Sequence, residues 1–151
     1  MAALPSTLKL MSFPIRSPRH QTGGLFVFAR ILDKIRLDAA GQLPAGYHVG
    51  IVPGNRTFDD RVCRLLGVDF DALKARTLAS GPDEEVLEWC FAHGRRPDAE
   101  QVEIWNGFIS KRGWRDSAQS GFDKAKAEAG FAAREDIQCY FDLMDAEEGR
   151  A

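Results

Sequence analysis

The stretch LFVFARILDKIRLDAA, residues 25–40, carries apolar side chains at intervals of three and four residues. This spacing places them on one side of an α-helix, while the charged side chains fall on another face. Gly41 follows directly, and glycine is common just past the end of a helix. We therefore predict an amphipathic helix whose apolar face packs into a core. Its apolar positions are Leu25, Phe28, Ile31, Leu32, Ile35 and Ala39.

Six further segments have helical patterns and are separated mainly by glycine. Thr57 with Asp60, and Asp98 with Gln101, have the three-residue spacing of side chains that cap helix starts. The last segment leaves its acidic side chains together on one surface while its apolar face packs inward. The predicted ranges are 57–67, 69–79, 82–93, 98–112, 116–129 and 135–148.

These patterns predict an all-α fold with two parts. Residues 1–22 are rich in proline and serine and lack periodicity, so we expect an extended N-terminal arm. Residues 23–151 are expected to form one compact domain of about six to seven helices. Between residues 43 and 56 apolar positions alternate as in a strand, but a lone strand has no pairing partner, so we expect an ordered loop.

Composition is that of an ordinary globular domain. The chain has 151 residues, of which 44 % are apolar and 28 % are charged. A chain of this length buries about 70 % of its unfolded surface on folding. Lys9 and the prolines around it interrupt the apolar start, which argues against a signal peptide, and no apolar run is long enough to span a membrane. We expect a soluble cytoplasmic protein with no membrane contact.

The three cysteines, Cys63, Cys90 and Cys139, show no CxxC spacing. Helical periodicity places Cys90 and Cys139 beside apolar residues, so we predict reduced, buried thiols in a reducing compartment. A catalytic thiol is the alternative.

Charge is distributed unevenly along the chain. Up to Arg36 there are six basic residues and one acidic residue, whereas from Glu135 onward there are six acidic residues and one basic residue. Nucleic-acid binding needs a basic surface that the protein does not itself neutralise, so we expect no nucleic-acid partner. The pattern instead predicts that the basic arm docks on the acidic final helix, within one chain or across a homodimer.

Three local patterns resemble an uncharacterised bacterial family known as domain of unknown function 5069. They are Arg16-Ser17-Pro18-Arg19 followed by Gly23-Gly24, the run Arg30-Ile31-Leu32-Asp33-Lys34-Ile35-Arg36, and the ending from Tyr140-Phe141-Asp142 to Gly149-Arg150. Tyr47 and Asp60-Arg61 also have counterparts in the family, while the insert from Val49 to Arg56 is longer here. The resemblance implies similarity over the full length, but the family offers no activity to transfer.

The arm and the first helix form the best candidate site. Arg16 and Arg19 precede Gly24, and a helix starting there would present free N–H groups and a positive dipole end to a phosphate or carboxylate. The alternative is that both arginines pair with Asp142, Asp145 or Glu148 of the final helix and fasten the arm to the fold.

Charged residues of the first helix offer a second set of candidates. Arg30, Asp33 and Lys34 share one face, which is usually solvated. If Tyr47 and the arm cover that face, it becomes a cleft in which Asp33 or Lys34 could act as an acid or base. The predicted ligand-binding residues are Arg16, Arg19, Gly24, Asp33, Lys34, Tyr47 and Arg61.

No motif indicates a cofactor or metal. His20, His48 and His93 lack metal-ligand spacing, and nucleophile motifs of the GxSxG kind and GxxxxGK phosphate loops are absent from the sequence. We predict no metal and no cofactor, and leave open whether the chain is an enzyme.

Two functions remain as hypotheses. The first is a small-molecule site, binding or catalytic, that selects an anionic group, and the second is a non-enzymatic module for protein interaction or assembly. A concave pocket containing Arg19, Lys34, Tyr47 and Arg61 would support the first, and a flat apolar patch would support the second.

Overall fold

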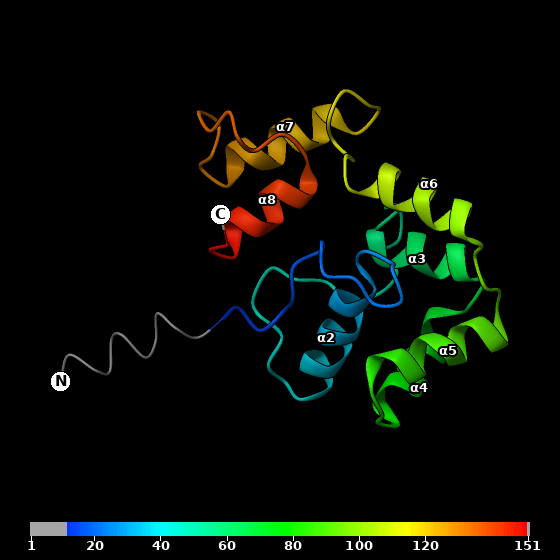
Figure 1. The fold of residues 1–151 in the computed structure, drawn as a ribbon. Helices are drawn as coiled ribbons and strands as arrows, with labels where there is room; N and C mark the ends of the chain where they lie inside the picture. Colours follow the sequence, from blue (N-terminus) through cyan, green and yellow to red (C-terminus); the bar gives the residue numbers. More distant parts are fainter. Residues whose placement is uncertain (1–11, 151) are drawn as a thin grey trace.

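The computed structural model describes residues 12–150 and confirms the all-α prediction, since this part of the chain has seven helices and no strand. The segment between residues 43 and 56 is a loop, as expected. Residues 1–11 of the predicted arm, and residue 151, lie outside the described residues. The helices, labelled in Figure 1, are α2 (Phe28–Ala39), α3 (Phe58–Leu66), α4 (Phe70–Leu78), α5 (Asp83–His93), α6 (Ala99–Ile109), α7 (Gln119–Glu128) and α8 (Tyr140–Glu147).

Three helix starts are capped by side chains, two of them at the cap spacings noted in the sequence and the third by Asp69, the first residue of a predicted helical range. Asp98 and Gln101 form a complete capping box at α6, with each side chain accepting a hydrogen bond from the other residue's backbone N–H. Thr57 accepts from the N–H of Asp60 at the start of α3, and Asp69 caps α4 in the same way. These starts were predictable because a cap involves only residues three positions apart.

The first helix begins at Phe28 and not at Leu25, so its predicted start was wrong. Thr22 and Leu25 exchange two backbone hydrogen bonds, of 3.0 and 3.1 Å, and hold a tight turn there. Val27 then has a φ of 77°, which is incompatible with helix and strained for a β-branched residue. Its N–H donates to the carbonyl of Pro18 at 3.0 Å, so the arm helps to hold this conformation.

The last helix also begins later than predicted, at Tyr140 and not at Glu135. Cys139 is extended, with a φ of −151°, and the N–H of Tyr140 donates to the carbonyl of Arg112 at 2.9 Å. This contact ties the start of α8 to the connection between α6 and α7. It joins residues far apart in sequence, so local periodicity could not reveal it.

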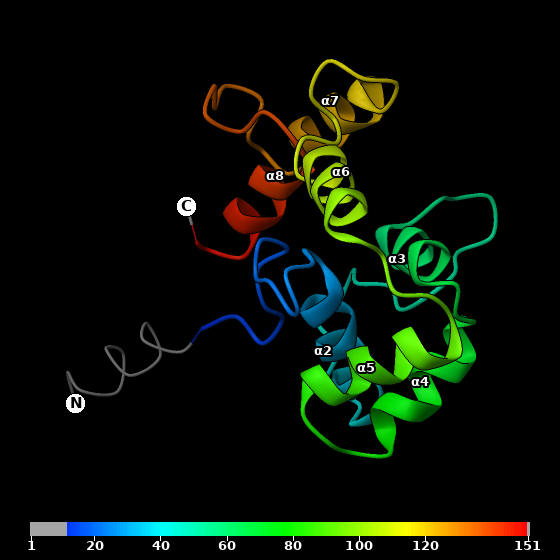
Figure 2. The same ribbon diagram turned by 45° about the vertical axis from the view of Figure 1, so that its right-hand side comes forward.

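Helix α2 lies at the centre of the molecule, with α4 and α5 on one side and α8 on the other (Figures 1 and 2). Phe28, Ile31, Leu32 and Ile35 are fully buried there, as the periodicity of the sequence predicts. A smaller cluster built on Phe122 joins α7 to α8. Among residues 12–150, no helix has the length and apolar character needed to cross a membrane.

All three cysteines are free and buried, as predicted. Burial raises the pKa of the Cys63 and Cys90 thiols to about 12. The thiolate is the reactive form of cysteine, so these two side chains act as packing groups.

Candidate functional site

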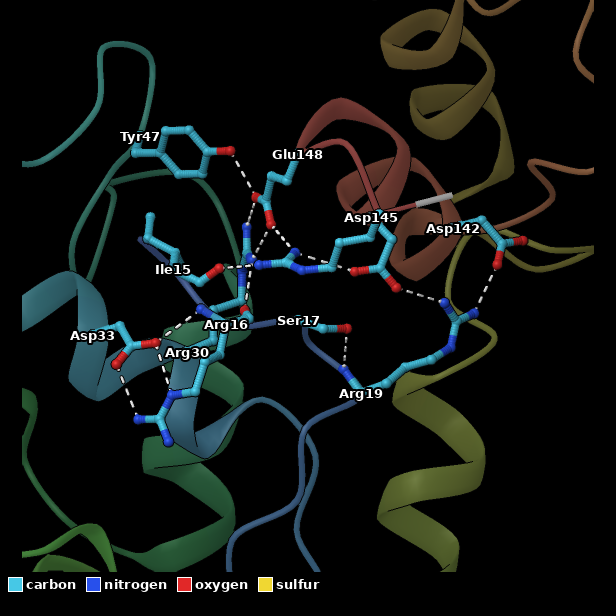
Figure 3. A network of polar contacts seen from close by, with 11 residues as sticks. Ile15, Arg16, Ser17, Arg19, Arg30, Asp33, Tyr47, Asp142, Asp145 and Glu148 are labelled. Atoms are coloured by element: carbon cyan, nitrogen blue, oxygen red, sulfur yellow. Dashed lines mark hydrogen bonds and ion pairs between the residues drawn. The ribbon is translucent and has the colours of Figure 1, made fainter. Parts of the chain in front are cut away.

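The described part of the arm is fastened first by Arg16 (Figure 3). Its Nε donates to Oδ2 of Asp33 at 3.0 Å and its Nη2 to Oδ1 of the same carboxylate at 2.9 Å. Nη2 also lies 2.6 Å from Oδ2 of Asp83 in α5. Arg16 therefore links the arm to α2 and α5 instead of to the final helix.

Arg19 makes the predicted contact with the final helix, and it does so within the same chain. Its guanidinium lies 2.7 Å from Asp142 and 3.0 Å from Asp145. Arg19 bridges Asp142 and Asp145, and Arg150 bridges Asp145 and Glu148, so the three carboxylates lie together as expected. Asp145 and Glu148 are nevertheless each only 8 % exposed. Arginine partners neutralise these carboxylates and so permit their burial.

Glu148 connects four parts of the molecule (Figure 3). Arg30 of α2 donates two hydrogen bonds to its carboxylate, of 2.9 and 2.6 Å, and the hydroxyl of Tyr47 donates a third at 2.6 Å. Arg150 binds the same carboxylate and also donates to the carbonyl of Ile15 in the arm. The arm, α2, the loop that carries Tyr47 and the end of the chain thus meet at the buried carboxylate of Glu148.

These hydrogen bonds fix the charge of Glu148. Burial alone would raise its pKa, but the hydrogen bonds from Arg30 and Tyr47 and the Arg30 charge outweigh burial and hold the pKa below its usual value. Burial and the bond to Glu148 raise the pKa of the Tyr47 hydroxyl, which therefore stays protonated as a donor. Glu148 and its hydrogen-bond partners therefore hold these segments of the fold together.

Gly24, predicted as part of an anion site at a helix start, lies ahead of α2 and not in its first turn. The carbonyl of Gly24 accepts a hydrogen bond from Nδ2 of Asn106 in α6 at 2.7 Å, and the N–H of Phe26 donates to Oδ1 of the same amide at 3.2 Å. Gly24 therefore lies in a turn ahead of the helix, tied to α6. Arg16, Arg19 and Asp33 pair with one another or with acidic partners.

A pocket of about 600 Å³ lies elsewhere, between α2, the loop of residues 45–57, α3 and α8. We call it the α8 pocket. Of the predicted site residues, it brings together Lys34, Tyr47 and Arg61, and the other four predicted residues do not line it. Its lining holds five basic and three acidic side chains: Arg30, Lys34, Arg56, Arg61, Arg112, Asp59, Glu147 and Glu148.

Asp59 positions the loop wall of the pocket. Its carboxylate accepts from Nζ of Lys34 at 2.8 Å through Oδ1, and from the N–H of Gly50 at 2.8 Å through Oδ2. Lys34 also donates to the carbonyl of His48 at 3.0 Å, and Thr57 donates to that of Gly50 at 3.1 Å. The charge of Lys34 is therefore already neutralised within the wall.

Arg61 is the basic side chain of the pocket that has no acidic partner among residues 12–150. Its guanidinium lies over the ring of Phe108, 5.2 Å from the centroid, and Arg112 lies over the same ring at 5.4 Å. Burial lowers the pKa of Arg61, and the neighbouring charges of Arg112 and Arg56 lower it further. The guanidinium remains ionised at neutral pH, since arginine does not lose its proton in proteins.

Positive charge exceeds negative charge around Arg61. Asp60 pairs with both Arg56 and Arg64 at 3.0 Å, and Asp116 lies 3.4 Å from Arg112. Four arginines thus share two carboxylates. We call Arg56, Arg61, Arg64 and Arg112 the arginine cluster.

Sequence reasoning missed most of the pocket wall. Arg112 looked like an ordinary basic residue at a helix end, Asp59 carried no motif, and Glu147 belonged to a family pattern without being singled out as a site residue. The usable signals were Lys34 on the first helix and, through the family resemblance, Tyr47 and Asp60-Arg61. The others come together because α8 packs on Phe58 at the start of α3 and because Glu148, next to its end, binds Arg30 of α2, which no local pattern indicates.

Comparison with known families gives one match. The model of the family described as "Domain of unknown function (DUF5069)" matches residues 12–150, and this range includes residues 12–22 of the arm and the α8 pocket. A comparison with curated proteins found no match. The family match covers nearly the whole length of 151 residues, so this chain belongs to the DUF5069 family.

Proposed function

We propose that the chain binds a small anionic molecule in the α8 pocket, with Arg61 and Arg112 as the main contacts. The observation that carries this proposal is Arg61, a pocket-lining guanidinium with no carboxylate partner among residues 12–150. A bound carboxylate or phosphate would supply the missing negative charge. It would also reduce the repulsion between Arg61 and its arginine neighbours.

Size and chemistry of the pocket support a small ligand. A volume of about 600 Å³ falls within the range of small-molecule sites, roughly 300–1,000 Å³. Guanidinium groups bind carboxylates and phosphates through paired hydrogen bonds. Phe108 holds both guanidinium groups over its ring, which restricts their motion before a ligand arrives.

We propose binding alone and no catalysed reaction. Lys34 and Tyr47, the pocket side chains best suited to proton transfer, already donate to Asp59 and Glu148. We also propose a cytoplasmic location, which the three free buried cysteines favour because such thiols persist in a reducing compartment.

Calorimetric titration of phosphate and citrate tests the proposed binding. We expect Arg61→Gln to weaken binding by about 10- to 100-fold, since hydrogen bonds to a charged group contribute ~1.5–3 kcal/mol. Arg134→Gln is the matched control, because Arg134 also lies over an aromatic ring, that of Phe131, but outside the pocket. Equal affinity in the wild type and Arg61→Gln would refute the proposal.

The assembly hypothesis has less support. Among the exposed large apolar side chains, Ile104 and Phe108 lie one turn apart on α6, but two guanidinium groups lie over the ring of Phe108 and make this surface partly charged. Single exposed apolar residues are common on monomers. Sedimentation showing a stable homodimer that Ile104→Asp disrupts would favour the assembly hypothesis.

A further inference from the structure

The α8 pocket has basic side chains near the start of α8 and an acidic side chain, Glu147, at the end of α8. Tyr140, Met144 and Glu147 line it at successive turns of one helix face. Seven residues of helix separate the first from the last, or about 10 Å along the axis. The N–H of Tyr140 donates to the carbonyl of Arg112, and Arg112 lies with Arg61 over the ring of Phe108, so these two arginines lie near the start of α8 while Glu147 lies at its end.

Negative charge is unmatched at the Glu147 end. Arg30 is bound by Glu148, and Lys34 is bound by Asp59, so each of these cations already has its own carboxylate partner. Glu147 itself has no ion-pair partner within residues 12–150. Glu147 is exposed, but partial desolvation at the pocket edge and the neighbouring Glu148 carboxylate raise its pKa despite the opposing charge of Arg30, so a further positive charge beside Glu147 would be stabilising.

We propose that the ligand of the α8 pocket is amphoteric, with a carboxylate or phosphate held by Arg61 and Arg112 and an amine held by Glu147. This inference rests on the proposed anion binding. It adds the class of molecule, a small amino acid or amino phosphate whose two charges lie several bonds apart.

Other ligand types match the two ends less well. A dianion long enough to span the pocket would place its second charge against Glu147 and be repelled. A simple amine would meet the excess positive charge of the arginine cluster. A molecule with both groups neutralises the unpaired charge at each end, since Arg61 and Glu147 are both pocket-lining and unpaired within residues 12–150.

The test compares two probes that differ by one amine, ε-aminocaproate and caproate, by NMR titration of the full chain. We expect ε-aminocaproate to bind about fivefold more tightly, the gain typical of one partly exposed ion pair. Glu147→Gln should remove this difference. Glu128→Gln, the control at an exposed glutamate of α7 outside the pocket, should preserve it.

The outcomes separate this inference from the proposed function. If caproate or phosphate binds through Arg61 but the amine gives no gain, or the gain survives Glu147→Gln, the amphoteric assignment is overturned and anion binding stands. If no probe binds, phosphate included, both are overturned. An amine-dependent gain that needs both Arg61 and Glu147 supports both.

Discussion

Glu148 is the residue on which the arrangement around the pocket depends most. Its side chain is only 1 % exposed, yet it accepts hydrogen bonds from Arg30, Tyr47 and Arg150. A buried charge is stable in the folded state only when partners replace the lost water. Each of the three partners belongs to a different segment, so loss of the carboxylate would loosen several contacts together.

We predict that Glu148→Gln lowers the free energy of unfolding by about 3–5 kcal/mol, because it leaves the buried guanidinium of Arg30 without its negative partner. Urea denaturation measures this change. The adjacent Glu147→Gln, at an exposed position without an ion pair among residues 12–150, should change stability by about 0.5 kcal/mol or less. Equal effects of the two variants would contradict the structural role of Glu148.

Stability should also fall in acid. Burial alone would raise the pKa values of Asp83, Asp142 and Glu148, but hydrogen bonds, including those from their arginine partners, lower all three. A lowered pKa in the folded state gives stability that is fully present above the unfolded pKa of about 4 and is lost as pH falls through the folded pKa. We expect an unfolding free energy that is flat near neutral pH and drops below about pH 4.5.

Thermal denaturation across a pH series checks this behaviour. Glu148→Gln should show a shallower acid loss than the wild type, since one of the titrating carboxylates is gone. An acid loss of the same size in both proteins would exclude Glu148 as a contributor.

At the scale of elements, the Tyr47 loop of residues 45–57 forms much of the pocket wall. Gly50 has a φ of 80°, and a Cβ atom there would lie 2.5 Å from the ring of Phe70. Gly54 has nearly the same φ, 81°, but a Cβ atom there would meet nothing within 4 Å. An alanine at Gly54 would therefore introduce backbone strain alone, whereas an alanine at Gly50 would introduce both strain and a steric clash.

We predict that Gly50→Ala costs more than 2 kcal/mol of stability and displaces the loop, because it combines left-handed strain with a clash. Gly54→Ala should cost only about 1 kcal/mol, the strain alone. Chemical denaturation gives both values, and anion titration shows whether the displaced loop weakens binding. Similar costs for the two variants would mean that Phe70 does not constrain the loop.

Helices could be predicted from sequence where their signals are local. The caps at Thr57, Asp69 and Asp98 involve residues three positions away, and each marks a helix start correctly. The start of α2 was misplaced because Val27 is held out of helical geometry by the distant Pro18. The pocket was predictable only in part, through Lys34, Tyr47 and Arg61, because the remaining wall depends on how helices distant in sequence pack.

In the molecule as a whole, the basic residues near the start of the sequence form ion pairs with acidic residues of the same chain. Arg19 meets Asp142 and Asp145, as the opposite charges of the two ends suggest. Arg16 pairs instead with Asp33 and Asp83. The opposite charges of the two chain ends do not predict these partners. The arginine cluster is left with excess positive charge even though the chain carries a net charge of −2.

Burial of all three cysteines gives a prediction for the molecule as a whole. A thiol reagent should label native protein slowly, at a rate that follows unfolding, because the thiols are buried and the pKa of Cys63 and Cys90 is raised to about 12 by burial. In denaturant all three should react rapidly. Mass spectrometry that detects fast labelling of any cysteine in the native protein would contradict this packing.

An NMR titration that follows the Nε–Hε signals of the arginine side chains as phosphate is added measures anion binding at Arg61 directly. We predict that the Arg61 and Arg112 signals shift together and saturate, while the signal of Arg134, which lies outside the pocket, does not move. Absence of a saturable shift at Arg61, or equal shifts at Arg61 and Arg134, would contradict anion binding in the α8 pocket.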